Sequence, residues 1–374
     1  MHHFRTVSDI RIERGGAARL DQHVEGLAGN RNILIITDPG LRKIGLLEAP
    51  CAALESAGFT VNIYDKVVAD PPQDMVLAAA GEAENCKAGL IIGFGGGSSM
   101  DTAKVVAALA AGKQPIEQMY GVGKVTGPRL PLLLIPTTAG TGSEVTNVAI
   151  LTIGAHEKKG IVDDVLYADR VLLDAELTLG LPPQITAATG IDAMVHAIEA
   201  YTSIRLKNPI SDALALSALE KLRSGLVDVC RDGSDIDGRE HVLIGAMLAG
   251  QAFSNAPCAA VHALAYPLGG FFHVPHGLSN ALVLTGVLKY NHAEAAHWYR
   301  EIADHLRLPH DLIEEMERIK AATNVPQTLA EVNIPETAIE MMAEDAMTKD
   351  RLLVNNPRPM TLEATIKIYQ DIAR

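Results

Sequence analysis

The sequence has little cysteine and a deficit of positive charge. Its 374 residues include only four cysteines, without a CxxC pair. This scarcity disfavours a disulfide framework or a thiolate metal site and fits a reducing compartment. With 32 Lys and Arg against 45 Asp and Glu, the chain lacks the clustered positive charge that nucleic-acid binding requires. We therefore expect no nucleic-acid partner.

Long apolar runs are also missing. No run reaches about 18 residues, and the first residues do not form a basic stretch followed by an apolar core. We expect neither a membrane span nor a secretion signal, and hence a cytoplasmic protein. The length and the 48% hydrophobic content exceed what a single core holds, which predicts two domains. A homo-oligomer, with a dimer as the commonest form, is the expected assembly.

Short apolar runs and helical segments alternate in the first half of the chain. The runs at 32–37, 60–64, 89–93 and 131–135 are bounded by turn residues, which is typical of a parallel sheet covered by helices on both faces. After about residue 179 the pattern becomes helical, with periodic segments at 193–201, 212–229 and 238–252 and no convincing strand. The sequence predicts a Rossmann-like α/β domain over residues 1–178 and an all-helical domain over residues 179–374.

A glycine-rich stretch at residues 93–98 follows one predicted strand and opens a helix. Such glycines let the backbone approach a pyrophosphate at a helix N-terminus. The stretch departs from G-x-G-x-x-G because Ser98 stands where the last glycine belongs. A tight strand-to-helix turn is the alternative interpretation. Upstream, Asp38 ends another strand, where it would accept from an adenosine ribose and repel a 2′-phosphate, or simply form a turn before Pro39.

A second polar glycine loop spans residues 136–144 and also follows a strand. Its hydroxyls and N–H groups suit a phosphate, a ribose or a nicotinamide amide. Two such loops at the carboxyl ends of two parallel strands predict a ligand site at that edge of the sheet.

The helical half carries a candidate metal site. Asp192 and His196 are four residues apart and therefore share one helix face. His262, His273 and His276 follow in apolar surroundings. One carboxylate with three imidazoles suits Fe(II) or Zn(II) and is too rich in nitrogen for Mg or Ca. The alternative for each histidine is an ordinary position in the core.

Several motifs together resemble the iron-containing (group III) alcohol dehydrogenases over nearly the whole chain. They are GGGSSMDTAK, PTTAGTGSE, GIDAMVHAIEAY, AFSNAPCAAVHALAYPLGG and HVPHGLSNA. The resemblance implies a nucleotide-binding α/β domain and an all-helical domain of the dehydroquinate synthase type. It also implies that NAD and a divalent metal ion bind in the cleft between the two domains. The metal would be Fe(2+), or alternatively Zn(2+) or another divalent ion, and the substrate would be an alcohol or an aldehyde.

The same resemblance assigns roles to individual residues. The implied metal ligands are Asp192, His196, His262 and His276. The implied NAD-binding residues are Asp38, Gly95, Gly96, Gly97, Ser98, Asp101, Thr137, Thr138, Ser143 and Lys159. His273 matches a position beside the metal, and Tyr266 replaces a histidine that is suspected in many relatives of passing the alcohol proton outward.

Tyr266 is expected mainly as an aromatic wall, because a phenol with an ordinary pKa of about 10 is a poor base near neutral pH. Pro267 follows it, and the sequence predicts that the helix containing His262 ends at this point.

The predicted chemistry is metal-assisted hydride transfer between an alcohol and NAD. Three alternatives remain at this stage: a metal-free reductase of the maleylacetate type, an NAD-dependent metal lyase or cyclase related to dehydroquinate synthase, and a non-enzymatic NAD sensor. The complete Asp/His/His/His set speaks against the metal-free reductase. The lyase or cyclase expects basic residues around a polyanionic substrate, whereas residues 253–283 contain no Lys or Arg.

Overall fold

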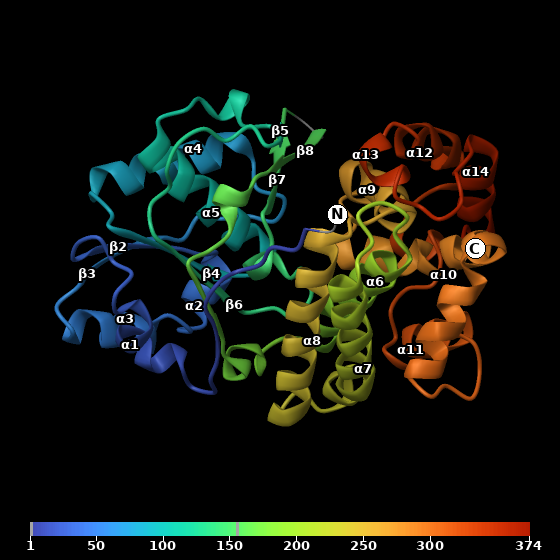
Figure 1. Ribbon diagram of the computed structural model, residues 1–374, viewed down its shortest axis with the longest axis horizontal. Coiled ribbons are helices and arrows are strands. Elements are labelled where there is room, and N and C mark those ends of the chain that lie inside the picture. The colour runs from blue at the N-terminus through green and yellow to red at the C-terminus, as the bar shows by residue number, and fades with distance from the viewer. Residues whose placement is uncertain (1–2, 155–156) are drawn as a thin grey trace. The chain divides into compact units, whose positions relative to one another are not determined.

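The computed structural model describes residues 3–154 and 157–374, and the contacts among them divide the chain into two units (Figure 1). The α/β unit contains Thr6–Thr138 and Gly142–Gly180. The helical unit contains Leu181–Arg374, the short segment Ala139–Thr141 and the described residues before Thr6. Each unit has its own secondary structure and is described separately.

A parallel sheet of six strands forms the centre of the α/β unit, in the order β1-β9-β6-β4-β2-β3. A second sheet of three strands has the order β5-β8-β7, with β7 and β8 antiparallel. The strands are β1 Ile10–Ile12, β2 Asn32–Ile36, β3 Thr60–Tyr64, β4 Leu90–Gly95, β5 Gly121–Val122, β6 Leu132–Pro136, β7 Val148–Ile153, β8 Glu157–Val162 and β9 Arg170–Leu173. The predicted strands at 32–37, 60–64, 89–93 and 131–135 are thus confirmed as β2, β3, β4 and β6.

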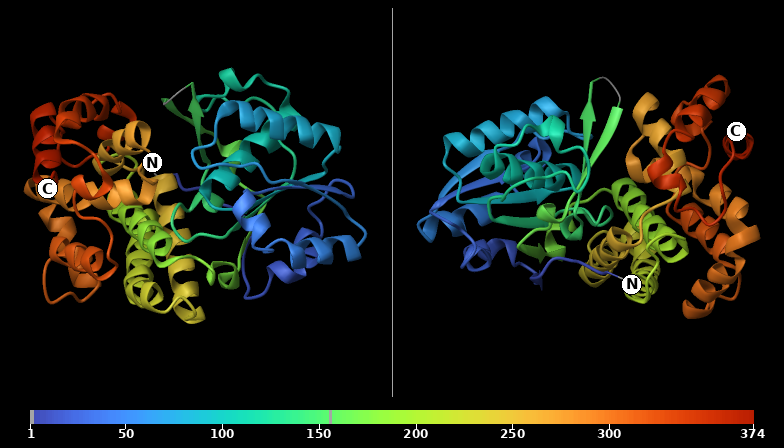
Figure 2. Two further views of the ribbon diagram at one scale, coloured as in Figure 1. Left: turned by 180° about the vertical axis from the view of Figure 1, so that it is seen from behind. Right: turned by 45° about the horizontal axis from the view of Figure 1, so that its top comes forward.

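Helices cover both faces of the large sheet, as both views in Figure 2 show. They are α1 Leu20–Val24, α2 Pro39–Lys43, α3 Glu48–Ser56, α4 Gln73–Asn85 and α5 Gly97–Gly112. Because side chains alternate between the faces of a strand, a sheet covered on both sides needs apolar residues at consecutive positions. Residues 33–36 of β2 meet this need, since all four are completely buried.

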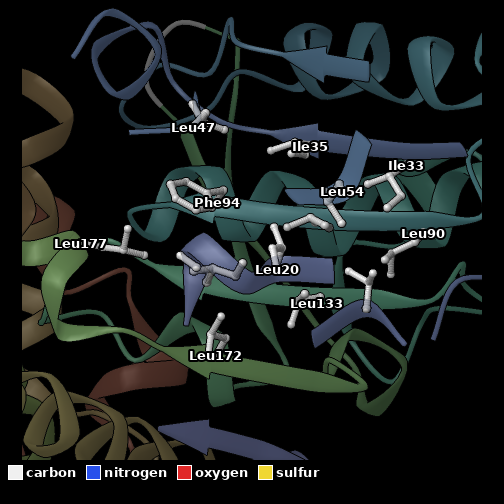
Figure 3. Packing of buried hydrophobic residues seen from close by; sticks show 14 residues of the cluster. Leu20, Ile33, Ile35, Leu47, Leu54, Leu90, Phe94, Leu133, Leu172 and Leu177 are labelled. Carbon is white, nitrogen blue, oxygen red and sulfur yellow. The ribbon is translucent and has the colours of Figure 1, made fainter. Parts of the chain in front are cut away.

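One face of the sheet packs against α1 and α3 (Figure 3). Leu20 of α1 and Leu54 of α3 lie in one cluster with alternate residues of the strands, among them Ile33, Ile35 and Leu133. Each of these side chains is fully buried, and burying one contributes roughly 1.5–3 kcal/mol. This packing fixes the strands, and therefore the loops at their ends.

The carboxyl ends of β2, β4 and β6 lie at one edge of the sheet, because these three strands are parallel neighbours. Asp38 follows β2, the first glycine loop follows β4 and the second follows β6. Gly95 stands opposite Pro136 in the register of β4 and β6. The fold thus brings the predicted nucleotide-binding segments to the same edge, as their order along the sequence predicts.

The helical unit contains no strand among its described residues, which confirms the prediction for the second half of the chain. Its helices are α6 Pro183–Thr202, α7 Pro209–Arg231, α8 Ile236–Asn255, α9 Ala260–Phe272, α10 His276–His305, α11 Leu312–Ala322, α12 Ile339–Ala346, α13 Asp350–Leu353 and α14 Leu362–Asp371. The helices α6, α7 and α8 pack against one another, and α10 packs on α6 and α9 (Figure 1). No single helix within the described ranges is long and apolar enough to cross a membrane, although α8 and α9 together pass that test across a bend of 107°.

The predicted end of the helix at Tyr266 is wrong. Helix α9 continues through Pro267 to Phe272 and ends where His273 adopts a left-handed conformation, with φ of 56°. Pro267 lacks the N–H that would bond to the carbonyl of Ala263, so the helix gives up one hydrogen bond. The apolar surroundings offset this loss, because Leu264 and Leu268 are completely buried on either side of it.

Candidate metal centre and nucleotide loops

The four predicted metal ligands converge in the helical unit. Asp192, His196, His262 and His276 each offer a ligand atom, and these atoms all lie within 4.8 Å of one another. The Oδ1 atom of Asp192 is 3.9 Å from Nε2 of His262 and 3.7 Å from Nε2 of His276. Two ligand atoms that share one metal at about 2.1 Å each lie roughly 3–4 Å apart. The cluster therefore has the dimensions of a mononuclear site.

Three helices position these side chains. The helical spacing of four residues puts Asp192 and His196 on one face of α6. His262 is in the first turn of α9, and His276 is the first residue of α10. The start of α10 passes so close to α6 that a Cβ at Gly277 would lie 2.3 Å from the carbonyl oxygen of Ala188. Only glycine permits this approach, which brings His276 to Asp192.

Burial and neighbouring groups together set the protonation of two of the predicted ligands. Burial lowers the pKa of His196 to about 3, so the ring is neutral near pH 7, as metal binding requires. Burial alone raises the pKa of Asp192, but the charges of His196, His276 and His262 outweigh it and leave the pKa below its ordinary value. Asp192 is therefore a carboxylate under the same conditions. Both groups are in the form that binds a cation.

Several polar atoms of the cluster are buried without a hydrogen-bond partner among the described residues. They are Nδ1 of His196, Nε2 of His262 and Oδ1 of Asn280. Leaving a buried polar atom without a partner costs roughly 1–3 kcal/mol. Three such atoms at one place fit a site that is completed by a bound cation, and the donor set of three imidazoles and one carboxylate fits iron or zinc.

Aromatic rings border the cluster. The ring of His196 stacks on Phe253, with centroids 4.3 Å apart. The ring of Tyr266 is tilted against His276, with centroids 6.3 Å apart. His276 itself has a side chain that is 44% exposed, in contrast to the other three ligands. The open side of the cluster is therefore at His276 and Tyr266, while His273 lies exposed at the end of α9.

Two buried residues that the sequence analysis missed contact the ligands. Asn280 donates through Nδ2 to Oδ1 of Asp192 at 2.6 Å, and it lies one helical turn after His276. Glu199 contacts Nδ1 of His262 at 2.6 Å. The spacing of four residues after His276 is a local signal that identifies Asn280. Glu199 stands seven residues after Asp192, on the same side of α6, in the quoted helix motif.

The first glycine loop is shaped as the pyrophosphate interpretation requires. Gly95 has φ of 152°, and a Cβ there would lie 2.6 Å from Oγ of Ser99. Gly96 is the N-cap of α5 and has no side chain to occupy the first N–H groups of that helix. Gly96, Gly97 and Ser98 are partly exposed. The start of this 16-residue helix thus keeps free N–H groups that suit an anion.

The second loop contacts the first. The N–H of Thr137 donates to the carbonyl of Gly95 at 3.0 Å. If Gly96 had a Cβ atom, that atom would lie 3.5 Å from Oγ1 of Thr138. The middle of the loop, Ala139–Thr141, belongs to the helical unit. The two predicted loops therefore meet at Thr137 and Thr138.

Asp101 and Ser143 form part of a buried network around Lys104. The hydroxyl of Ser143 donates to Oδ1 of Asp101 at 2.6 Å, and the N–H of Ile150 donates to Oδ2 at 2.9 Å. Nζ of Lys104 donates to Ser143, to Oγ1 of Thr146 and to the carbonyl of residue 148, at 2.8–3.1 Å. Burial raises the pKa of Asp101 and lowers that of Lys104. This network connects α5 to the second loop.

The remaining predicted cofactor residues are Asp38 and Lys159. Oδ1 of Asp38 accepts from the N–H groups of Gly40 and Leu41 and caps α2. Asp38 therefore forms the turn before Pro39 that the sequence analysis gave as one of its two interpretations. Lys159 lies on β8, is 44% exposed and pairs with Glu157 at 3.3 Å.

Family models match both halves of the chain. The model described as iron-containing alcohol dehydrogenase matches residues 8–175, and the C-terminal model of the Fe-containing alcohol dehydrogenase family matches residues 186–373. The chain belongs to the iron-containing alcohol dehydrogenase family. The long-chain-alcohol dehydrogenase 1 of Geobacillus thermodenitrificans is 40% identical over 96% of this chain and 94% of its own length.

Solved structures of this family have the same fold. A 1,3-propanediol oxidoreductase superposes with a TM-score of 0.94 at 30% identity, over 100% of both chains. The sulfoacetaldehyde reductase of Bifidobacterium kashiwanohense, solved in complex with NAD+, gives 0.87 at 27% identity over 100% and 99%. The resemblance inferred from the motifs is confirmed. The chain is an NAD-dependent alcohol dehydrogenase of the iron-containing type, which acts as an aldehyde reductase in reverse.

Proposed function

We propose that Asp192, His196, His262 and His276 together hold one divalent metal ion, with Fe(2+) first and Zn(2+) or another divalent ion as substitutes. The observation that carries this proposal is the convergence of these ligands with buried polar atoms that have no partner in the described parts of the chain. When bound, the metal supplies a Lewis acid for the oxygen of the alcohol or aldehyde. The complete ligand set disfavours a metal-free reductase of the maleylacetate type.

The chain's own residues orient and shield this site. Asn280 holds the carboxylate of Asp192 through its 2.6 Å hydrogen bond. The stack of Phe253 on His196 covers one side of the cluster and excludes water. The open side at His276 and Tyr266 is then where we propose that substrate enters.

We further propose that NAD binds along the glycine loops at the edge of the sheet. Gly95, Gly96, Gly97 and Ser98 would contact the pyrophosphate, since the start of α5 keeps its N–H groups available. Asp38 would use its second oxygen, Oδ2, for the adenosine ribose. Thr137, Thr138, Ser143, Asp101 and Lys159 would contact or support the rest of the cofactor. On this proposal residues 1–178 form the dinucleotide-binding domain and residues 179–374 the metal-binding domain.

The proton of the alcohol needs a way out of the site. We propose that it leaves through water or the nicotinamide ribose, with His273 assisting from its exposed position at the end of α9. Tyr266 then serves as an aromatic wall beside His276.

We propose an unbranched alcohol, or the corresponding aldehyde, as the substrate. A long-chain-alcohol dehydrogenase and a 1,3-propanediol oxidoreductase are both close in sequence or structure. An NAD-dependent lyase or cyclase is disfavoured, because residues 253–283 offer no Lys or Arg for a polyanionic substrate. We also propose a cytoplasmic homo-oligomer, a dimer as the commonest symmetric form.

The test combines metal analysis with turnover. Purified protein is mixed with NAD and a panel of straight-chain alcohols from methanol upward, and the absorbance of reduced nicotinamide is followed. We expect about one divalent ion per chain, and loss of turnover on chelation without unfolding. Active protein without a stoichiometric divalent ion would contradict the assigned ligands, and turnover of none of the alcohols or aldehydes would contradict the substrate class.

A further inference from the structure

Glu199 is a buried acidic residue outside the proposed set of metal ligands. It lies on α6, and its side chain is 4% exposed. Oε2 is 2.6 Å from Nδ1 of His262, and Oε1 accepts from the backbone N–H of Val261 at 2.7 Å. The two oxygens therefore receive two N–H groups from consecutive residues at the start of α9.

This arrangement determines which nitrogen of His262 is free. In the neutral ring, a proton on Nδ1 donates to Glu199 and leaves the lone pair on Nε2. That atom is the one buried without a partner among the described residues, 3.9 Å from Oδ1 of Asp192. A ligand histidine needs this tautomer, and partners on its other nitrogen commonly tune metal affinity.

We propose that Glu199 is a positioning residue that fixes the tautomer and the ring orientation of His262 for metal binding. The inference rests on the proposed metal site and adds to it a residue outside the ligand set. A carboxylate suits this role better than an amide, because both donors need an acceptor. With glutamine, one of the two sites would face an NH₂ group, which either opposes the N–H of Val261 or favours the wrong tautomer of His262.

Cys258 completes a second group with Glu199 and His262, whose potential ligand atoms also lie within 4.8 Å of one another. A metal bound between Oε2 and Nδ1 would hold these atoms about 3.3 Å apart, given metal–ligand distances near 2.1 Å. Their separation of 2.6 Å is that of a direct hydrogen bond. Glu199, Cys258 and His262 therefore do not form a second metal site; Glu199 supports His262 in the first.

The experiment measures the affinity of the apoprotein for Zn²⁺ by competition with a chromophoric chelator. Glu199→Gln keeps the size of the side chain and removes one acceptor. We expect the dissociation constant for Zn²⁺ to rise by about 10- to 100-fold, the range seen when such partners are removed. The spectrum of the Co²⁺-loaded variant should also change, because the ring of His262 is no longer held in one orientation.

Two controls separate positioning from packing. Cys258→Ser changes a side chain beside the same ring, keeps a group that can hydrogen-bond to His262 and leaves Glu199 in place, so its zinc affinity should stay within about threefold. Glu315→Gln removes another carboxylate of the helical unit that is only 1% exposed. It should lower stability and leave the zinc affinity unchanged. Equal loss of zinc affinity in Glu199→Gln and Cys258→Ser, or no loss in Glu199→Gln, would overturn the proposal.

A measurement on the unmodified protein covers the case in which Glu199→Gln does not fold. Protein labelled with ¹⁵N-histidine and loaded with ¹¹³Cd²⁺ should show coupling of the metal to Nε2 of His262, and a proton on Nδ1 that exchanges slowly with water. Coupling to Nδ1 would contradict the role of Glu199 alone. Failure of the unmodified chain to bind Zn²⁺ or Cd²⁺ at all would instead refute the proposed metal site.

Discussion

The metal cluster and the network around Lys104 are both buried and polar, but they differ in how their atoms are paired. In the network, Nζ of Lys104 has three acceptors, which match the three N–H bonds of an ammonium group. Both oxygens of Asp101 also have donors. In the metal cluster, His196 and His262 each keep a buried nitrogen without a partner in the described chain.

This difference separates a structural cluster from a ligand site. Buried polar groups are nearly always paired, so a self-contained network stabilises the fold without any ligand. A group of unpaired atoms costs free energy until a ligand supplies the missing partner. Substitutions in the metal cluster should therefore affect activity more than stability. Substitution of Lys104, which has no proposed role in cofactor binding, should do the reverse.

The largest effect is expected for His262→Ala. Removing a partner of a ligand costs about 10- to 100-fold, so removing the ligand itself should lower turnover by more than about a hundredfold and abolish stoichiometric metal binding. The melting temperature of the metal-free protein should also fall, because Oε2 of Glu199 loses its partner on His262. His241→Ala, at an exposed position of the same unit, is the matched control. Metal analysis and the nicotinamide assay test this prediction. If the variant retains one metal ion per chain, His262 is not a ligand.

Lys104→Met should lower the stability of the protein. Lys104 is fully buried and lies 3.6 Å from Oδ1 of Asp101, so its loss leaves a buried carboxylate without its counter-charge. We expect the free energy of unfolding to fall by about 3–5 kcal/mol. Urea denaturation measures the free energy of unfolding. The control is Lys66→Met at an exposed position, which should change this free energy by less than about 0.5 kcal/mol. A loss below about 1 kcal/mol would mean that the network is not structural.

A second self-contained cluster, around Glu315, predicts a pH dependence. Burial raises the pKa of Glu315, but hydrogen bonds from Arg318, His310 and Arg223 outweigh it and bring the pKa to about 2. Since the ordinary value is 4.5, the stabilisation is complete above that pH and is lost as the pH falls from 4.5 towards 2.

With two partly exposed arginines, this stabilisation should amount to about 2 kcal/mol. In Glu315→Gln the unfolding free energy should be lower at pH 7 and should fall less steeply below pH 4.5. Urea titrations between pH 3 and 7 test this. Parallel curves for both proteins would contradict the assignment.

A smaller effect is expected at Asp38. Its charge at the end of β2 should disfavour the 2′-phosphate of NADP by on the order of 1 kcal/mol, or about tenfold in kcat/KM. Asp38→Gly should narrow the preference for NAD. Because Asp38 also caps α2, Asp38→Asn is the matched variant that keeps a cap and removes the charge, and it should narrow the preference to a similar extent. Equal use of both cofactors by the unmodified enzyme would argue against this role.

The smallest effect is expected for Tyr266→Phe, which keeps the ring near His276 and removes the hydroxyl. An aromatic wall predicts a change in kcat of less than about tenfold. Steady-state rates with metal content measured in parallel give the answer. A loss of about a hundredfold with the metal intact would make the hydroxyl a proton relay.

Local patterns predicted the α/β class of the first half of the chain and the helical second half. Consecutive apolar residues identified β2, β3, β4 and β6, and helical periodicity identified the second half of the chain. The strands β1, β5 and β9 were missed, because two to four residues carry too little pattern to separate a strand from a loop. The six-residue strands β7 and β8 were also missed. The end of α9 was wrong because tertiary packing outweighs the missing N–H of Pro267.

The four proposed ligands could be predicted because their spacing is local or their motif is distinctive. The role of Glu199 was not predicted, because its partner His262 is 63 residues away in the sequence. A polar residue on an apolar helix gives no indication of which distant residue it contacts. Asp101 and Ser143 were identified as cofactor residues from their motifs, whereas their hydrogen bonds to one another and to Lys104 depend on two segments 42 residues apart. Such long-range pairing becomes visible only in the folded chain.

The close passage of α10 over α6 at Gly277 has a consequence for the redesign of this enzyme. Any larger side chain there would push the two helices apart and would separate His276 from Asp192. Variant libraries that aim at new substrates should therefore leave position 277 fixed and diversify the open side of the cluster, where Tyr266 borders it. At that rim, changes in shape can alter substrate range while the ligand geometry is preserved.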